Sequence, residues 1–242
     1  MLAHVRGIDH AVILVRDLDL ARDTYARLGF TLTPRGFHSL GSQNHCIMFG
    51  RDYLELMALP AAPPAAFQYF ADFLSKGEGV GALALATEDV AAAYAELTQA
   101  GIAAEAPLAL SRPVGNLGEA RFTLVQLPPA ETPGFRTFLC QHHTREIVWR
   151  PEYQRHANGV GGIGSVSVAT PDPVRYARLF EGLPVGYAHA KASAVAAIRL
   201  RVGDKNAAAD SLQRGGFSPI ALKGGALAVG ADQAHGILLV FE

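Results

Sequence analysis

The chain repeats one pattern four times: a short apolar segment typical of a strand, a helix-like segment, and a glycine where the helix should end. In the first two copies the interval from the strand to this glycine is the same, from residue 10 to residue 29 and from residue 82 to residue 101. An internal repeat constrains a fold more than any single element, because every copy must form the same unit. The alternative is that unrelated strand–helix units share glycine stops.

The first copy predicts a strand, a helix that begins after Asp17, and three further strands, at residues 11–15, 18–28, 30–33, 46–49 and 53–58. The second predicts a strand, a helix and two closing strands at residues 81–86, 88–99, 120–127 and 135–141. The third copy, which ends its helix at Gly182, is too short for a full set of strands. We therefore expect an α+β fold of repeated βαβββ modules, divided into residues 1–157, which hold the first pair of modules, and residues 158–242, which hold a shorter, degenerate pair.

Composition excludes several classes of protein. Half of the residues are hydrophobic and 18% are charged, with a net charge of -1, so neither a disordered chain nor a nucleic-acid binder is expected. No apolar stretch reaches the roughly 18 residues of a membrane span. Residues 1–9 lack the order of a signal peptide, so a cytoplasmic location is expected. Cys46 and Cys140 lie in apolar segments and are expected to be buried, reduced thiols.

Two ionisable residues stand out in the first copy. His10 opens the first apolar strand, and Glu55 lies alone within the last. Strand alternation puts Leu54 and Leu56 on the face opposite Glu55, so a core on that face would turn the carboxylate into a concave interior. A buried carboxylate is costly unless it is paired, hydrated or bound to a metal. The alternatives are a histidine at a strand end and a glutamate paired with an arginine.

Several motifs carry a family resemblance. The dipeptide DH precedes the first strand, RDLDLARDTYARLGF follows it, and YLEL lies on the last strand of the module. Together they resemble the vicinal oxygen chelate superfamily. Two longer stretches, RGFHSLGSQNHCIMFGRDYLEL and QHHTREIVWRPEYQRHANG, resemble its glyoxalase-like domain proteins. The resemblance covers about residues 7–160 and implies paired modules that form a cup-shaped sheet.

The resemblance also implies a divalent metal (Zn, Fe, Mn or Ni) inside the cup, held by His10 and Glu55. The second module departs from the pattern, because Ala82 stands where His10 stands in the first and its last strand has no acid. That strand ends in His142 and His143, one of which must face the cup. From the family-like motif we expect His142 to be the third metal ligand. Histidine and carboxylate ligands suit all of these metals.

Other polar residues are candidates for substrate binding. His38 and Asn44 lie in a polar segment that could reach the cup or form a surface loop, and His45 competes with His38. Arg112 could pair with a substrate carboxylate or with Glu119. The remaining two candidates could cap the pocket mouth or anchor a linker; they are Trp149 and His156.

Three functions remain open at this point. The first is a metal-dependent glyoxalase-, lyase- or isomerase-like enzyme that acts on a small oxygenated substrate, with Glu55 also acting as a catalytic base. The second is an extradiol-type Fe(II) dioxygenase. The third is a metal-free protein that binds or sequesters a small molecule. No nucleic-acid or membrane partner is expected, and an exposed edge of the cup favours a homodimer.

Overall fold

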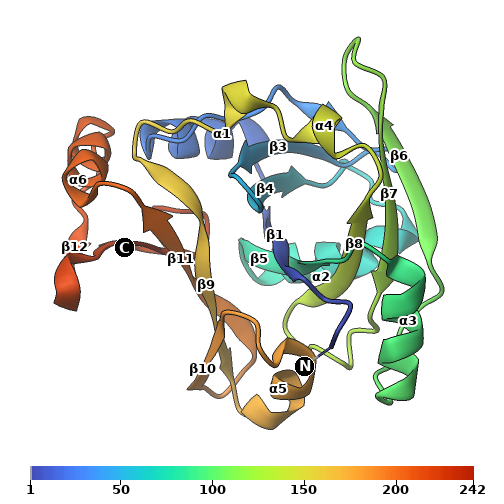
Figure 1. Ribbon diagram of the computed structural model, residues 1–242. Coiled ribbons are helices and arrows are strands. Elements are labelled where there is room, and N and C mark those ends of the chain that lie inside the picture. The colour runs from blue at the N-terminus through green and yellow to red at the C-terminus, as the bar shows by residue number, and fades with distance from the viewer. Residues whose placement is uncertain (1) are drawn as a thin grey trace.

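The computed structural model describes residues 2–242, which form two mixed β-sheets (Figure 1). The first sheet has the strand order β2-β3-β4-β1-β5-β8-β7-β6. Its strands are β1 (Gly7–Leu14), β2 (Gly36–Phe37), β3 (Gln43–Met48), β4 (Tyr53–Ala58), β5 (Gly79–Ala86), β6 (Leu108–Pro113), β7 (Glu119–Gln126) and β8 (Arg136–His142). The second sheet has the order β10-β9-β11-β14-β13-β12. Its strands are β9 (Val160–Thr170), β10 (Val185–His189), β11 (Ala194–Val202), β12 (Ile220–Ala221), β13 (Leu227–Val229) and β14 (Leu238–Phe241).

Helices connect these strands and cover the sheets. The α-helices are α1 (Leu18–Arg27), α2 (Gln68–Lys76), α3 (Val90–Gln99), α4 (Arg145–Val148), α5 (Pro173–Phe180) and α6 (Lys205–Arg214). Three short 3-10 helices are η1 (Ala65–Phe67), η2 (Pro151–Tyr153) and η3 (Lys223–Gly225). Within residues 2–242, none of the helices is both long and apolar enough to cross a membrane.

The first two repeats pair through their first strands in the first sheet. β1 pairs antiparallel with β5, and each of these strands pairs in parallel with the last strand of its own module, β4 or β8. The short edge strands β2 and β6, at the two ends of the strand order, also touch each other. The sheet therefore rolls into a nearly closed cup, and the predicted α+β fold of βαβββ modules is confirmed.

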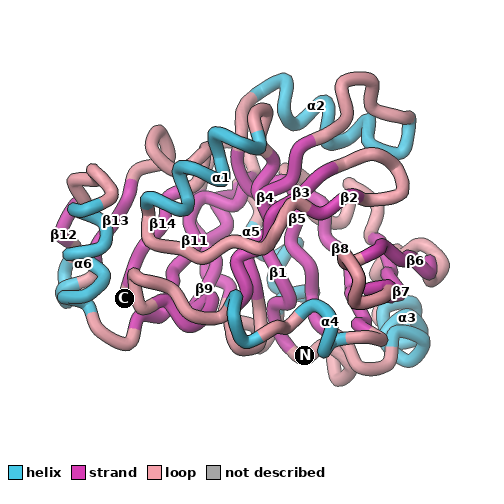
Figure 2. Tube along the Cα trace, turned by 90° about the horizontal axis from the view of Figure 1, so that it is seen from above, coloured by secondary structure: helices cyan, strands magenta, loops and turns pink. Residues whose placement is uncertain are grey.

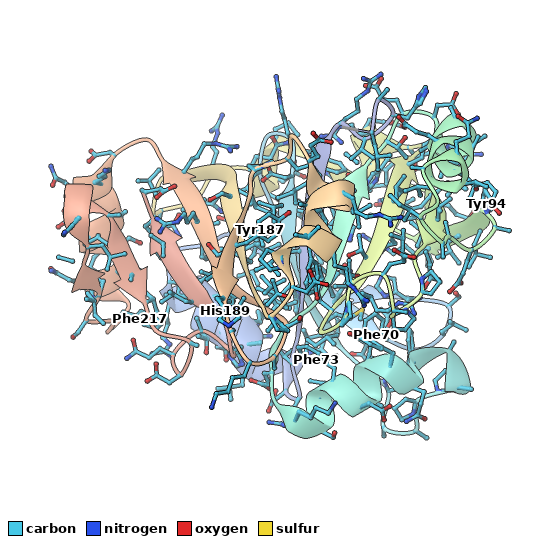
Figure 3. All side chains as sticks on the ribbon, turned by 90° about the horizontal axis from the view of Figure 1, so that it is seen from below. Phe70, Phe73, Tyr94, Tyr187, His189 and Phe217 are labelled. Carbon is cyan, nitrogen blue, oxygen red and sulfur yellow. The ribbon has the colours of Figure 1, made fainter. Side chains whose placement is uncertain are left out.

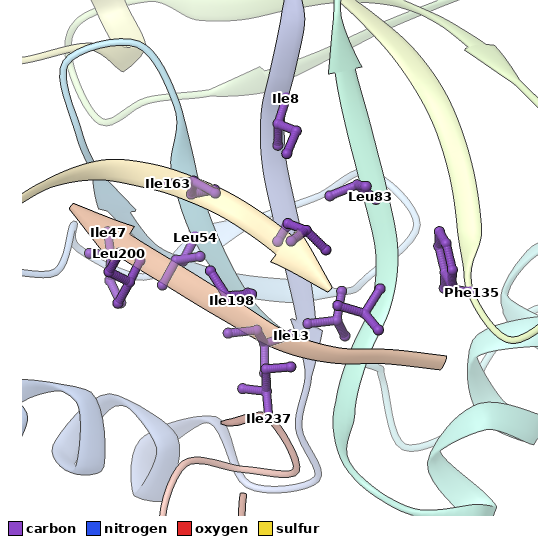
Figure 4. Close-up of a cluster of buried hydrophobic side chains, with 14 of the residues drawn as sticks. Ile8, Ile13, Ile47, Leu54, Leu83, Phe135, Ile163, Ile198, Leu200 and Ile237 are labelled. Atoms are coloured by element: carbon purple, nitrogen blue, oxygen red, sulfur yellow. The ribbon is translucent and has the colours of Figure 1, made fainter. Parts of the chain in front are cut away.

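Alternation along the strands separates the interior of the cup from the hydrophobic core. Leu54 and Leu56 are fully buried in the main core cluster, together with Ile198 and Leu200 of the second sheet (Figure 4). Glu55 has the opposite orientation and faces the cup. Burying four such aliphatic side chains contributes about 6–12 kcal/mol. The core thus lies between the two sheets and fixes which strand residues turn inward.

Local signals set the ends of α1. The Asp17 side chain caps the helix by accepting a hydrogen bond from the Leu20 N–H, as its position predicted. Gly29 follows the helix with φ 91°. A Cβ atom there would lie 2.2 Å from Ser211 Oγ on α6, so glycine also permits close approach of the C-terminal helix.

Two helices close the cup at different ends (Figure 2). On α2, Phe70 and Phe73 lie on the side of the helix that faces the body of the molecule (Figure 3) and pack against Val12 and Leu14. Val148 of α4 belongs to a separate cluster inside the cup. Apolar side chains therefore line the interior at both ends.

Strand positions differ from the sequence prediction in two places. Residues 30–33, predicted as a strand, have no regular structure, and the edge strand β2 forms later, at Gly36–Phe37. β6 was not predicted, because its side chains are largely exposed and lack a clear alternation. The short third repeat holds only β9, α5 and β10, and β10 returns in parallel directly beside β9.

A buried polar contact connects the first sheet to the second. Asp52, in the turn between β3 and β4, accepts a hydrogen bond from the Ile163 N–H of β9 at 2.8 Å. Burial raises the pKa of Asp52 to about 6, although this hydrogen bond and Arg201 act in the opposite direction. The domain division at residues 157 and 158 remains a proposal, because the two sheets share one core.

Candidate metal centre

Four polar side chains from three strands meet inside the cup. Asp9 and His10 come from β1, Glu55 from β4 and His142 from the end of β8, and all four side chains are at most 9% exposed. His142, and not His143, turns inward: its ring contacts Tyr53, whereas the His143 ring lies at the surface and contacts Thr123. The pairing of β1 with β4 and with β5 brings these residues together.

Asp9 faces the cup because of an irregularity in β1. Strict alternation would put neighbouring residues Asp9 and His10 on opposite faces. The pairing of β1 with β5 shifts between Ile8 and His10, so that Asp9 is an extra residue in a β-bulge. Both side chains can therefore act at one site. Sequence alternation alone does not find Asp9; its only signal is the DH dipeptide at the strand start.

Asp9 bridges the two histidines. Its Oδ1 lies 2.6 Å from His10 Nδ1 and 3.0 Å from His142 Nε2. Burial opposes ionisation, but the hydrogen bonds and charges of His10 and His142 hold the pKa of Asp9 well below its ordinary value. An ionised carboxylate only accepts hydrogen bonds, so each histidine donates an N–H to it.

This arrangement fixes the tautomer of His10. With its Nδ1 donating to Asp9, a neutral His10 presents the bare Nε2 lone pair on the other side of the ring. The nearest carboxylate oxygen there is Glu55 Oε2, at 3.6 Å. The ring is also stacked on Tyr53, with centroids 4.3 Å apart. Two acceptors therefore face each other in a buried place, and only a cation or a proton between them relieves the repulsion.

Glu55 is held by amide and imidazole groups of the neighbouring strands. Asn44 Nδ2 donates to Glu55 Oε1 at 2.6 Å, and His38 Nε2 lies 3.8 Å from the same oxygen. Burial lowers the pKa of His38, although Glu55 acts in the opposite direction, so the imidazole tends to be neutral. The segment that holds His38 and Asn44 was expected either to reach the cup or to form a surface loop. The contacts with Glu55 support a place in the cup.

A divalent metal fits this donor set. His10 and Glu55 would be its ligands, with Asp9 behind the histidine in the arrangement of many protein metal sites, where a carboxylate orients a ligating imidazole. Two ligand atoms on a common ion lie about 3–4 Å apart, given bonds of roughly 2.1 Å, and the 3.6 Å between His10 Nε2 and Glu55 Oε2 agrees with this. His38 is a candidate third donor on the Glu55 side, although its ligand atoms and those of His10 and Glu55 do not all lie within 4.8 Å of one another.

A second cluster lies beside the first. Ligand atoms of Asp9, Cys140 and His142 lie within 4.8 Å of one another, the one such cluster of three among residues 2–242. Burial raises the pKa of the Cys140 thiol well above its ordinary value, which disfavours the thiolate that binds metals. Asp9 already accepts from both histidines. The donor chemistry therefore favours His10 and Glu55, and the role of His142 as a ligand stays a proposal.

A cavity of about 320 Å³ reaches the neighbourhood of Glu55 through Cys46, although none of the four polar residues of the site lines it. Cys46 lines it and pairs directly with Glu55 across β3 and β4. Arg112 lines it from β6 and makes no ion pair with Glu119 among residues 2–242, and its predicted role in substrate binding stays a proposal. Trp149 is buried next to it, with its ring 4.8 Å from that of His142. The indole Nε1 and His142 Nδ1 are buried atoms for which the described residues offer no partner.

Two predicted binding residues lie outside the cup. His45 lies beside Asn44 on β3 and therefore points to the opposite face, where its Nδ1 contacts the Thr33 carbonyl. His156 accepts from the Thr31 N–H and donates to the Met48 carbonyl between the rings of the core. Its ring anchors the linker, which was the alternative for this segment. Neither ring lies in the cup as predicted: backbone groups hold both nitrogens of His156, whereas they hold His45 at Nδ1 only, and His45 Nε2 is buried without a partner among residues 2–242.

Comparisons with known proteins agree with the fold. The family model of the glyoxalase-like domain matches residues 8–184. A hypothetical protein from Staphylococcus aureus superimposes with a TM-score of 0.72 at 14% identity, covering 98% of both chains. A mutant of 4-hydroxymandelate synthase from Streptomyces coelicolor superimposes with a TM-score of 0.64 at 13% identity, covering 98% of this chain and 92% of that one.

A third solved structure is a fusion protein of a xylose isomerase-like TIM barrel and 4-hydroxyphenylpyruvate dioxygenase. It gives a TM-score of 0.58 at 15% identity and covers 98% of this chain but 49% of the fusion protein. A comparison with curated proteins gave no match. The family match spans most of the chain, and the structural likenesses extend over its whole length. The chain belongs to the family of the glyoxalase-like domain.

Proposed function

We propose that this protein is a metal-dependent enzyme that acts on a small oxygenated substrate by lyase or isomerase chemistry. The supporting observation is the pair of buried acceptors, His10 Nε2 and Glu55 Oε2, which face each other at 3.6 Å with Asp9 fixing the histidine tautomer. A metal bound there would polarise a substrate carbonyl group. The family match and the cup-shaped sheet agree with this proposal.

The chain's own residues would move a proton. Glu55 Oε1, which Asn44 holds at 2.6 Å, is the atom that would accept a proton from the carbon next to the carbonyl. His38 Nε2, at 3.8 Å from this oxygen, is placed to exchange that proton. Asp9 keeps the His10 Nδ1–H occupied, so that Nε2 stays available as a donor atom. α2 and α4 exclude water from the two ends of the cup.

Extradiol-type Fe(II) dioxygenase chemistry is the second candidate. His38 supports it, because two histidines and one carboxylate are the donor set of many non-haem iron enzymes. That set would be His10, His38 and Glu55. Catechol-dependent oxygen uptake by the iron-loaded protein, with ring-cleavage products, would select this candidate over the first.

Metal stoichiometry tests both enzyme proposals. The protein is purified without chelator or affinity metal, and elemental analysis is followed by calorimetric titration with Zn²⁺, Mn²⁺, Ni²⁺ and Fe²⁺. We expect close to one equivalent to bind, and Glu55→Ala and His10→Ala to abolish tight binding. His143→Ala is the matched control, because this exposed histidine lies beside the cup and should leave affinity unchanged.

A wild type that binds no divalent metal would refute both enzyme proposals and leave a metal-free binding protein. His38→Ala and His142→Ala separate the two candidates for the third ligand, since only loss of a true ligand should weaken binding strongly.

A cytoplasmic location and a homodimer complete the proposal. Light scattering during gel filtration tests the dimer, which a monomer mass at working concentration would contradict.

A further inference from the structure

The cavity beside the candidate metal centre is strongly biased toward positive charge. Three arginines line it, and none of its lining residues is an aspartate or a glutamate. Its apolar wall consists of Met48, Val114, Leu117, Ile147 and Val148. A ligand that fills this space must therefore combine a negative group with an apolar body.

The three arginines are not equivalent. Arg35 donates to Gln43 and Asp19, at 2.6 Å in each case, and Arg150 is paired with Glu152. Arg112 makes no hydrogen bond and no ion pair with any residue in the described range 2–242. One guanidinium therefore remains uncompensated on the cavity wall, although it lies only partly exposed on a strand.

Arg112 lies where the two ends of the rolled sheet meet. Across the gap on β2 is Gly36, where a Cβ atom would lie 3.3 Å from Arg112 Nη1 and 2.3 Å from Asn44 Oδ1. The backbone of Gly36 thus permits both side chains to approach, and Asn44 in turn donates to Glu55. The free guanidinium and the amide that holds the candidate catalytic carboxylate therefore both lie against Gly36.

We propose that the cup binds a small monocarboxylic acid with an apolar body, and that Arg112 holds its carboxylate through a two-pronged hydrogen bond. This inference rests on the proposed function, because it specifies the substrate class of the same site. A planar guanidinium fork matches a carboxylate geometrically. A single uncompensated cation matches a single negative charge. The cavity of about 320 Å³ is at the small end for ligand sites, which favours a compact acid.

The chain's only tryptophan provides the readout. Trp149 is buried beside the cavity, in one cluster with Met48 and Val148, so a ligand should change its fluorescence. Phenylacetate is titrated into the full-length protein, and phenylacetamide serves as its neutral isostere. We expect saturable quenching by the acid and about tenfold or more weaker binding of the amide, because the charge-assisted pair is lost. Acetate should bind more weakly than phenylacetate, because it lacks the apolar body.

Arginine variants link the effect to Arg112. Arg112→Gln should lose the preference for acid over amide, and Arg112→Lys should retain part of it. Arg121→Gln is the matched control, since Arg121 lies exposed on the neighbouring strand and is absent from the cavity wall. Melting temperature checks that each variant folds; if Arg112→Gln does not fold, Arg112→Lys against wild type carries the test.

Three results would overturn the proposal. They are equal affinity for acid and amide, an unchanged preference in folded Arg112→Gln, and the absence of saturable quenching by the acid. Tighter binding of phenyl phosphate than of phenylacetate would replace the monocarboxylate with a dianionic ligand class and so also contradict it. The titrations are run with excess chelator and again after metal loading. Dependence on Arg112 that persists without metal would separate this inference from a failure of the proposed metal chemistry.

Discussion

Removing the Asp9 carboxylate should destabilise the fold measurably. Asp9 is 1% exposed and accepts from both His10 and His142. Asp9→Ala would leave two buried N–H groups without an acceptor, each at a cost of about 1–3 kcal/mol. Removing the buried carboxylate recovers part of that cost, so we expect a net loss of about 2–4 kcal/mol in the free energy of unfolding. The total free energy of unfolding of a typical domain is about 5–15 kcal/mol.

Asp9→Asn provides the matched variant. The asparagine Oδ1 can still accept from both histidines, so the loss should be smaller than for Asp9→Ala. The pH dependence separates the two contributions. Because the folded pKa of Asp9 is depressed, its stabilising contribution is present above the ordinary value of 3.8 and is lost as the pH falls below it. Asp9→Asn should flatten this acid limb.

Urea unfolding followed by circular dichroism, from about pH 3 to pH 8, measures both effects. Asp210→Ala, an exposed aspartate on α6, is the control and should change stability by less than about 0.5 kcal/mol. If Asp9→Ala costs less than about 1 kcal/mol with an unchanged urea slope, the two histidines do not depend on Asp9. The tautomer argument for His10 would then fail.

Three further predictions concern other parts of the chain. Burial raises the pKa of Asp52 to about 6, so the free energy of unfolding should fall as the pH rises from about 4 to about 6, by up to roughly 3 kcal/mol. Urea unfolding should show this pH dependence in the wild type and not in Asp52→Asn. The same pH dependence in both proteins would refute the prediction. Gly36→Ala should displace Asn44, weakening the metal affinity measured by calorimetry about tenfold, and unchanged affinity would contradict the packing argument. Burial raises the pKa of Cys46 to about 12 and that of Cys140 well above its ordinary value, so an aromatic disulfide reagent should label neither thiol until the protein is unfolded; rapid labelling of the native protein would contradict this.

The sequence was a good guide where hydrophobic periodicity decided the outcome. Leu54 and Leu56 identified the core face of β4, and that alone placed Glu55 inside the cup. The cap at Asp17 and the glycine at residue 29 marked the ends of α1, because both depend on local backbone geometry. These features involve neighbours in sequence, so a pattern in the chain reports them.

The site depended on features that periodicity does not report. Asp9 enters the cup through a bulge, which breaks the alternation on which strand predictions depend. His45 and His156 are chemically indistinguishable from pocket residues in the sequence, yet on the core side their rings contact the carbonyl groups of Thr33 and Met48. Such long-range pairing is set by tertiary packing. A histidine's role therefore followed from its partners and not from its residue type.

The edge strands were the other failure. β2 is two residues long and β6 is largely exposed, so neither has the apolar alternation of a central strand. Their meeting closes the cup and brings Arg112 close to Gly36. The arginine that we propose to bind the substrate carboxylate therefore comes from the part of the fold that sequence patterns describe least well.

An anomalous difference map from crystals soaked in Zn²⁺ would test the metal centre most directly. We predict one peak about 2.0–2.2 Å from both His10 Nε2 and Glu55 Oε2, with Asp9 still hydrogen-bonded to His10 Nδ1. The same map would show whether His38 or His142 is the third ligand. A peak at Asp9, Cys140 and His142, or no peak inside the cup, would contradict the account.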